Sequence, residues 1–174
     1  MLEASIGPDI TTINGLAIKA AIQPARLWDV LGEPSRIVDP APPAPFGHRN
    51  NQIHVYDQLG LYFNEHHFTR LVQSLTFVFV PAEHRYTFCP SQSFAGRLLL
   101  GGYEVRPGAS ESDVIRGTAI PFRRSLAGQW RTGGDGFGVG LSAVGAKIPS
   151  GRRSKNRRVV SVDVAWPHDP WQRA

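Results

Sequence analysis

Three stretches of the chain are similar in residue pattern to three others that follow in the same order 87 residues further on, and this spacing constrains the fold more than any other feature. The repeated blocks are Ile13–Ile18 with Leu100–Val105, Leu27–Pro34 with Val114–Pro121, and Ser74–Phe79 with Ser161–Trp166. Blocks that keep one order and one offset indicate duplication of a structural unit. We therefore expect a first unit over 12–81, a linker over 82–93 and a second unit over 94–167.

Each predicted unit begins with a short strand, over 13–18 in the first copy, and continues with a short helix. In the first unit the helix is expected over 24–31, because Pro24 suits the first helical turn and Gly32 with Pro34 ends the helix. In the second unit Ser110 is positioned to cap a helix over 111–117.

The last strand of each unit shows the clearest pattern, since large apolar residues occupy every second position of 74–79 and 161–166. The positions between them include Ser74, Thr76, Ser161 and Asp163. A period of two predicts an antiparallel sheet that is packed on one face and wet on the other. The predicted fold class is therefore α+β, with two tandem helix-plus-antiparallel-strand units that share or extend one sheet. Helices are expected on one face, and a partner on the open face.

The composition favours a cytoplasmic protein with many turns. Eighteen Gly and fourteen Pro are typical of short elements. Cys89 is the single cysteine, which excludes an internal disulfide, and the chain has neither a signal-peptide pattern nor a long apolar run.

Motifs for catalysis are weak, and we expect no enzyme activity, no cofactor and no metal. The stretch Gly140–Gly145 is one residue too long for a nucleophile elbow, and Gly136–Gly140 has the spacing of a strand rather than of a phosphate loop. The adjacent pair His66–His67 lacks the i, i+4 spacing of metal ligands on a helix. A site assembled from distant residues stays open.

A basic run over 151–158 is the strongest local charge feature and accounts for much of the net charge of +5. Three interpretations stay open: an acidic protein partner, nucleic acid bound through phosphates, and a solvated loop between two strands.

Candidate partner-binding residues combine this run with aromatic side chains and a predicted hairpin tip. Tyr, Trp and Arg are the usual anchors of protein interfaces. The candidates are Tyr56, Tyr62, His66, His67, Arg70, Trp130, Arg152, Arg153, Lys155, Arg157 and Arg158.

The segment Leu31–Pro34, a helix end followed by three strands, resembles the repeating unit of the β-lactamase inhibitor protein fold and of small outer-membrane assembly lipoproteins. The second copy, Gly117–Pro121, lacks the Leu-Gly pair, and the chain has no lipid-attachment cysteine. The stretches Val55–Leu61 and Phe94–Leu98 resemble bacterial immunity proteins of polymorphic-toxin and type VI secretion systems.

These resemblances imply a non-catalytic, protein-binding inhibitor. The expected function is that of a cytoplasmic immunity protein that neutralises a cognate bacterial toxin by occluding its active site, with an acidic contact surface on the toxin. The alternative is a nucleic-acid-binding protein that uses the loop 151–158.

Overall fold

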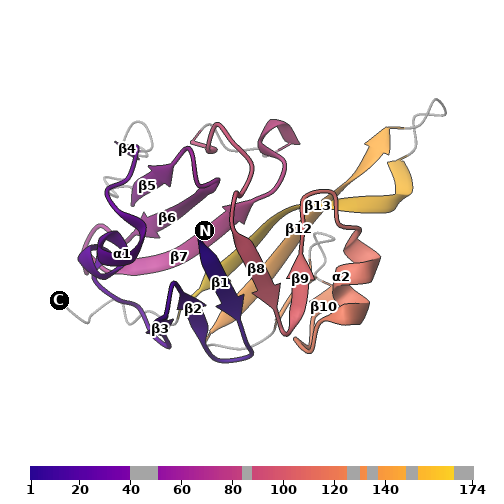
Figure 1. The fold of residues 1–174 in the computed structure, drawn as a ribbon, viewed down its shortest axis with the longest axis horizontal. Coiled ribbons are helices and arrows are strands. Elements are labelled where there is room, and N and C mark those ends of the chain that lie inside the picture. The colour runs from indigo at the N-terminus through magenta and orange to yellow at the C-terminus, as the bar shows by residue number, and fades with distance from the viewer. Residues whose placement is uncertain (40–50, 84–87, 125–129, 133–136, 148–152, 167–174) are drawn as a thin grey trace.

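The computed structural model describes residues 1–39, 51–83, 88–124, 130–132, 137–147 and 153–166 (Figure 1). In chain order the elements are β1 (Glu3–Ile6), β2 (Thr11–Ile13), β3 (Leu16–Ile18), α1 (Pro24–Leu31), β4 (Arg36–Val38), β5 (Gln52–Tyr56), β6 (Leu61–Glu65), β7 (Val72–Val78), a short 3-10 helix (Pro81–Glu83), β8 (Arg97–Leu100), β9 (Tyr103–Val105), α2 (Glu111–Gly117), β10 (Arg123–Arg124), β11 (Trp130–Arg131), β12 (Gly138–Lys147) and β13 (Arg153–Ala165).

The strands form two sheets that pack face to face. The smaller sheet has the order β3-β2-β1-β8-β9, in which β1 and β8 run parallel. The larger sheet has the order β10-β11-β12-β13-β7-β6-β5-β4 and is antiparallel throughout its described strands. Buried apolar side chains of both sheets form one core, to which α1 and α2 each add a fully buried residue, Leu27 and Val114. Figure 1 shows the two helices at opposite ends of this sandwich.

The predicted fold class, α+β with helices on one face, is wrong. The regular secondary structure of the described residues is mostly β-strand, and a second sheet covers the packed face where helices were expected. The error arose because β1 was missed and because two hairpins were interpreted as single strands. Asn14 and Gly15 have φ values of 46° and 85°, and Gly101 and Gly102 have 53° and 85°. Such pairs of positive φ angles form two-residue hairpin turns, so 11–18 and 97–105 each fold back on themselves.

Both predicted helices are confirmed with their ends. In α1, Pro24 occupies the first turn, and the Gly32 N–H donates to the Trp28 carbonyl oxygen at 2.8 Å. In α2, the Ser110 hydroxyl accepts a hydrogen bond from the Asp113 N–H at 3.1 Å.

Strands β7 and β13 pair at the centre of the larger sheet, and their register is symmetric. Thr76 lies opposite Asp163, 87 residues later, and Ser74–Ala165 and Val78–Ser161 are the flanking pairs. The helices α1 and α2 begin 87 residues apart, as do β4 and β10. The duplication itself, with units over 12–81 and 94–167 and a linker over 82–93, stays a prediction.

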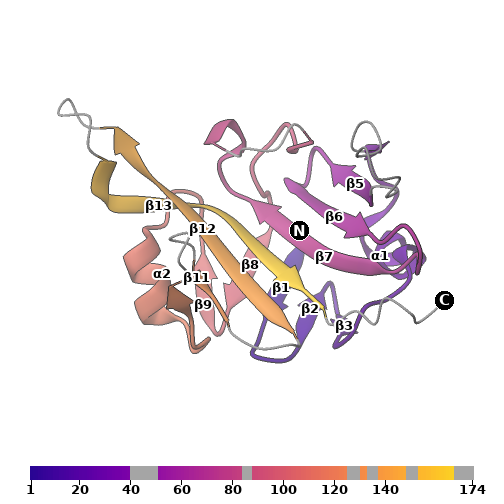
Figure 2. The same ribbon diagram turned by 180° about the vertical axis from the view of Figure 1, so that it is seen from behind.

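The basic run is not a simple loop between strands, because β13 already begins at Arg153. Lys147 of β12 pairs with Arg153, and the two strands extend past α2 as a two-stranded arm (Figures 1 and 2). Arg152 and the predicted glycine turn 133–136 lie outside the described residues.

Candidate functional site

A buried hydrogen-bonded pair, formed by His54 of β5 and Glu65 at the end of β6, lies on the core face of the larger sheet. His54 and Glu65 are 1% and 3% exposed, and the His54 Nε2 lies 2.7 Å from Glu65 Oε2. The His54 ring stacks on Phe63 with a centroid distance of 4.4 Å, because these residues are opposite each other in the register. The His54 Nδ1 is buried and has no hydrogen-bond partner among the described residues.

Burial decides the protonation of His54. Desolvation lowers the pKa of His54 below its ordinary value of 6.5, although the hydrogen bond to Glu65 opposes this effect. The neutral ring then donates its Nε2–H to Glu65 and keeps an unpaired lone pair at Nδ1. Because His54 and Glu65 are almost inaccessible, they support the structure around them rather than general acid–base chemistry on a ligand.

Arg70 connects this buried pair to the surface. The Arg70 Nε lies 2.6 Å from Glu65 Oε1, and Nη2 donates to Gln52 Oε1 at 3.1 Å. Arg70 has a φ of 57°, a conformation that costs energy in a residue with a side chain. The contacts to Glu65 and Gln52 therefore compensate for a strained backbone at the end of the turn.

The turn between β6 and β7, residues 66–70, presents one aromatic side chain to solvent. Phe68 is 71% exposed, and its ring lies beside that of His67 at a centroid distance of 4.1 Å. The His66 N–H donates to the Leu71 carbonyl at 2.8 Å, and the Arg70 N–H donates to the His66 carbonyl at 2.9 Å. We call residues 66–70 the aromatic turn.

Side chains on both flanks hold the aromatic turn in place. The His66 Nδ1 accepts from the Thr69 N–H at 3.3 Å. On the other flank Asn51 Oδ1 lies 3.3 Å from His67 Nδ1, and Asn51 donates to Gln73 Oε1 at 2.6 Å. Phe68 is therefore exposed on a turn whose neighbours are already fixed by hydrogen bonds.

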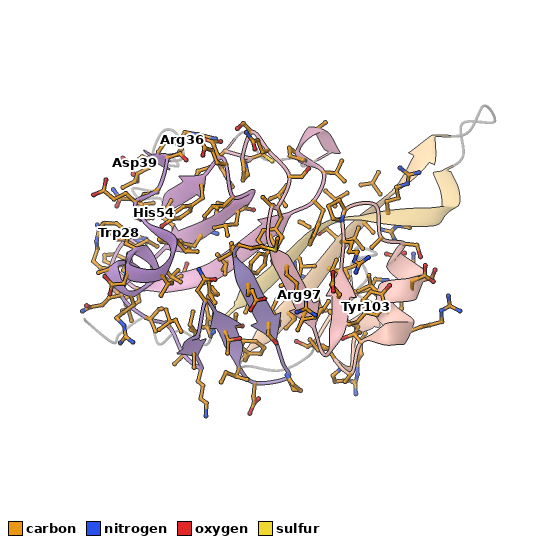
Figure 3. The ribbon with its side chains drawn as sticks, viewed as in Figure 1. Trp28, Arg36, Asp39, His54, Arg97 and Tyr103 are labelled. Carbon is orange, nitrogen blue, oxygen red and sulfur yellow. The ribbon has the colours of Figure 1, made fainter. Side chains whose placement is uncertain are left out.

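Two further apolar side chains are exposed near His54. Trp28 of α1 is 37% exposed and its ring lies 5.7 Å from that of His54 (Figure 3). Ile37 of β4 is 48% exposed and lies opposite His54 in the register. This end of the molecule combines exposed apolar surface with the Arg70 guanidinium.

The structure brings three of the predicted partner-binding residues together, namely His66, His67 and Arg70 in the aromatic turn. Tyr56 and Tyr62 are buried instead, with 3% and 4% of their surface exposed. The Tyr56 hydroxyl donates to the Gly32 carbonyl at 3.0 Å, and burial raises the Tyr56 pKa above its ordinary value. The Tyr62 ring packs edge-on against Phe88. Neither tyrosine lies on a free surface in this structure.

The remaining predicted residues lie in the second half of the chain. Trp130 packs against the main core and is half-buried. Arg157 Nη1 lies 3.1 Å from Glu111 Oε1 of α2, whereas Arg158 is exposed. Arg153 and Lys155 belong to β13, but their side chains, like Arg152, fall outside the described part of the structure.

Sequence reasoning missed Phe68, Trp28, Ile37 and the buried pair. The best available signal for Phe68 was its place in an otherwise polar hairpin tip, His66–Arg70. Within the described ranges, no three His, Cys, Asp or Glu side chains cluster in a way that suits a metal ion.

Comparison with known proteins gives a family but no characterised relative. Residues 3–114 match the family described as Domain of unknown function (DUF7738). No curated protein and no solved structure matches the chain. Among the described residues, none of the helices has the length and apolar character needed to span a membrane.

Proposed function

The chain belongs to DUF7738, a family of unknown function, and we propose that it is a non-catalytic protein-binding inhibitor. In this proposal it is a cytoplasmic immunity protein that neutralises a cognate bacterial toxin by occluding the active site of the toxin. The observation that carries the proposal is Phe68, which is 71% exposed on a turn already fixed by its neighbours.

An exposed aromatic side chain costs solvation free energy unless a partner covers it. Aromatic residues and arginine dominate the binding energy of protein interfaces, usually near the centre of the contact. Because the backbone of the aromatic turn is held by hydrogen bonds, little conformational entropy is lost when Phe68 enters a partner's pocket. A rigid projecting aromatic is well suited to fill an active-site cleft.

The surroundings of Phe68 fit the same role. Arg70 contributes a guanidinium whose side chain is 57% exposed, and Trp28 and Ile37 extend the apolar surface at this end. A stable inhibitor complex buries about 1,200–2,000 Å² in total, so further residues must contribute. The net charge of +5 favours an acidic contact surface on the partner and faster association with it.

The test is co-expression with candidate toxins encoded beside this gene. The wild-type chain is expected to restore growth and to purify with the toxin in a 1:1 complex. Phe68→Ser should weaken the complex about tenfold or more and lose protection, because an aromatic anchor is worth at least ~2 kcal/mol.

Gln58→Ser is the matched control, since Gln58 is an exposed turn residue at the opposite end of β6. This variant should protect as well as the wild type, and both variants should show unchanged thermal unfolding. If Phe68→Ser protected as well as the wild type, the aromatic turn would not be part of the interface. A chain that forms no complex with any neighbouring gene product would count against the inhibitor proposal as a whole.

Nucleic-acid binding is the second candidate, and the two-stranded arm of β12 and β13 favours it. A two-stranded ribbon fits the major groove of B-DNA, and β13 in this arm contains residues 153–158 of the basic run. Arg158→Ala is the cleaner probe, because Arg157 is already paired with Glu111. Binding that falls steeply with salt and weakens in Arg158→Ala would support this candidate, and no binding at about 50 mM salt would remove it.

A further inference from the structure

One row of side chains crosses the outer face of the larger sheet, which is the face turned away from the smaller sheet. Residues directly opposite each other in an antiparallel pair project to the same side. The register therefore aligns Arg36, Val55, Tyr62 and Thr76 from the first half with Asp163, Gly140, Arg131 and Arg123 from the second. We call this the outer row.

In the first half a segment of the chain itself covers the outer row. Val55 and Tyr62 pack with Ile53 and Val78 in a small apolar cluster beneath Phe88 and Cys89. Arg36 anchors the covering segment, because its guanidinium donates to Asp57 at 2.9 and 3.2 Å and to the Cys89 carbonyl at 3.0 Å. The first half thus illustrates how an extended segment is held on this face by an arginine.

The second half keeps an arginine at one matching position and has different residues at the others. Arg123 stands where the first half has Arg36, Arg131 where it has Val55, and Gly140 where it has Tyr62. The Asp163 carboxylate lies over Gly140, since a Cβ added there would be 2.3 Å from Asp163 Oδ2. This half of the face is therefore polar, with a carboxylate where the first half has an aromatic ring.

Arg123 and Arg131 lie directly opposite each other, and both are exposed. Like charges in this position destabilise a sheet unless an anion lies between or beside them. Desolvation raises the pKa of the Asp163 carboxyl, and the positive charge of Arg131 opposes this effect. No hydrogen bond or ion pair among the described residues involves Arg123.

The net charge of the two halves also differs. Residues 94–174 contain thirteen Lys and Arg and six Asp and Glu. Residues 1–93 contain six Lys and Arg and eight Asp and Glu. The positive charge of the chain is therefore concentrated in its second half, which attracts acidic partners more strongly than the first half does.

We propose that the outer face of β10–β12 binds an extended acidic segment of a partner protein. The segment lies across this face as Phe88–Ser91 lies across the first half, with its carboxylates on Arg123 and Arg131. This surface differs from the aromatic turn, so either proposal can fail without the other.

The test uses a labelled ten-residue glutamate peptide and the full-length chain. Amide resonances of Arg131, Gly138 and Gly140 are expected to shift on titration, and those of β5 and β6 are not. The double variant Arg123→Glu, Arg131→Glu should weaken binding about tenfold or more, since each reversed charge replaces an attraction by a repulsion.

Arg106→Glu is the matched control, because Arg106 is an arginine of the same half that is 75% exposed and lies away from this face. Arg106→Glu should change the affinity less than about twofold. It is compared with the single variant Arg123→Glu, which alters the net charge by the same amount. Equal losses of affinity in Arg123→Glu and Arg106→Glu would mean non-specific attraction and would overturn the proposal. Amide resonance shifts centred on 153–158 would overturn it for the same reason. A thymidine ten-mer that binds the same residues more tightly than the peptide would overturn it in favour of nucleic acid.

Discussion

Replacing Glu65 with glutamine tests the structural basis of the aromatic turn. Glutamine has nearly the same volume, so the change leaves no cavity, but its single carbonyl oxygen cannot accept from both His54 and Arg70. The amide oxygen should face the buried His54, while its NH2 group faces the Arg70 guanidinium and repels it. We expect Arg70 to turn toward solvent, which is open to it because its side chain is 57% exposed.

The expected loss of stability is about 2 kcal/mol. Losing the charge at the buried His54 contact accounts for about 1 kcal/mol, because hydrogen bonds to charged groups contribute about 1.5–3 kcal/mol and neutral ones about 1. The contact to Arg70 adds about 1 kcal/mol at most, since solvent screens a half-exposed guanidinium. The strained Arg70 backbone then has no compensating contact, and the aromatic turn should become more mobile.

Urea unfolding at pH 8 measures this loss, and a double-mutant cycle with His54→Phe isolates its buried part. Phenylalanine keeps the stacking on Phe63 but removes the donor at Nε2. The two substitutions should show an interaction energy of about 1 kcal/mol. Losses that add within about 0.3 kcal/mol, or a Glu65→Gln variant as stable as the wild type, would refute this explanation of the buried pair.

Three further predictions concern stability. The wild type should lose stability as the pH falls below about 7. The reason is that burial lowers the folded-state pKa of His54, so the unfolded chain binds more protons than the folded one. Urea unfolding midpoints measured from pH 8 to 5.5 should fall less in His54→Phe than in the wild type. Gly60→Ala should cost about 3 kcal/mol or more by thermal unfolding, because Gly60 has a φ of 69° and its added Cβ would lie 2.2 Å from the Phe94 nitrogen. Gly15→Ala, with a φ of 85° but no atom within 4 Å, should cost only about 1 kcal/mol; equal losses would contradict the close approach at Gly60. Ser110→Ala should cost about 1 kcal/mol through loss of the helix cap, and an unchanged melting temperature would contradict that role.

Local patterns predicted the local elements well. Pro24 and Gly32 marked the ends of α1, Ser110 marked the start of α2, and alternation identified β7 and the end of β13. These signals depend on neighbouring residues only, so tertiary context did not overrule them. The same patterns failed at the two-residue turns of the smaller sheet, where three-residue strands are too short to show alternation.

The layer arrangement and the site depended on contacts between distant residues. Nothing in the stretch Glu3–Ile6 shows that it pairs in parallel with Arg97–Leu100, and this pairing completes the second sheet. Likewise His54 and Glu65 are eleven positions apart and meet only because β5 and β6 pair. Tyr56 and Tyr62 resembled surface anchors, but Gly32 and Phe88 cover them from other elements.

The central pairing of β7 with β13 has a consequence for how the chain reaches its native state. Residues that pair between β7 and β13, such as Thr76 and Asp163, are 87 positions apart in the sequence. The larger sheet is therefore completed only after the slow closure of a long loop. Until then β7 is an open edge strand. Its native pairing with β13 is symmetric about the opposed residues Thr76 and Asp163. The same edge on another newly made chain offers nearly equivalent pairing, so crowded refolding should produce swapped dimers before it produces aggregates.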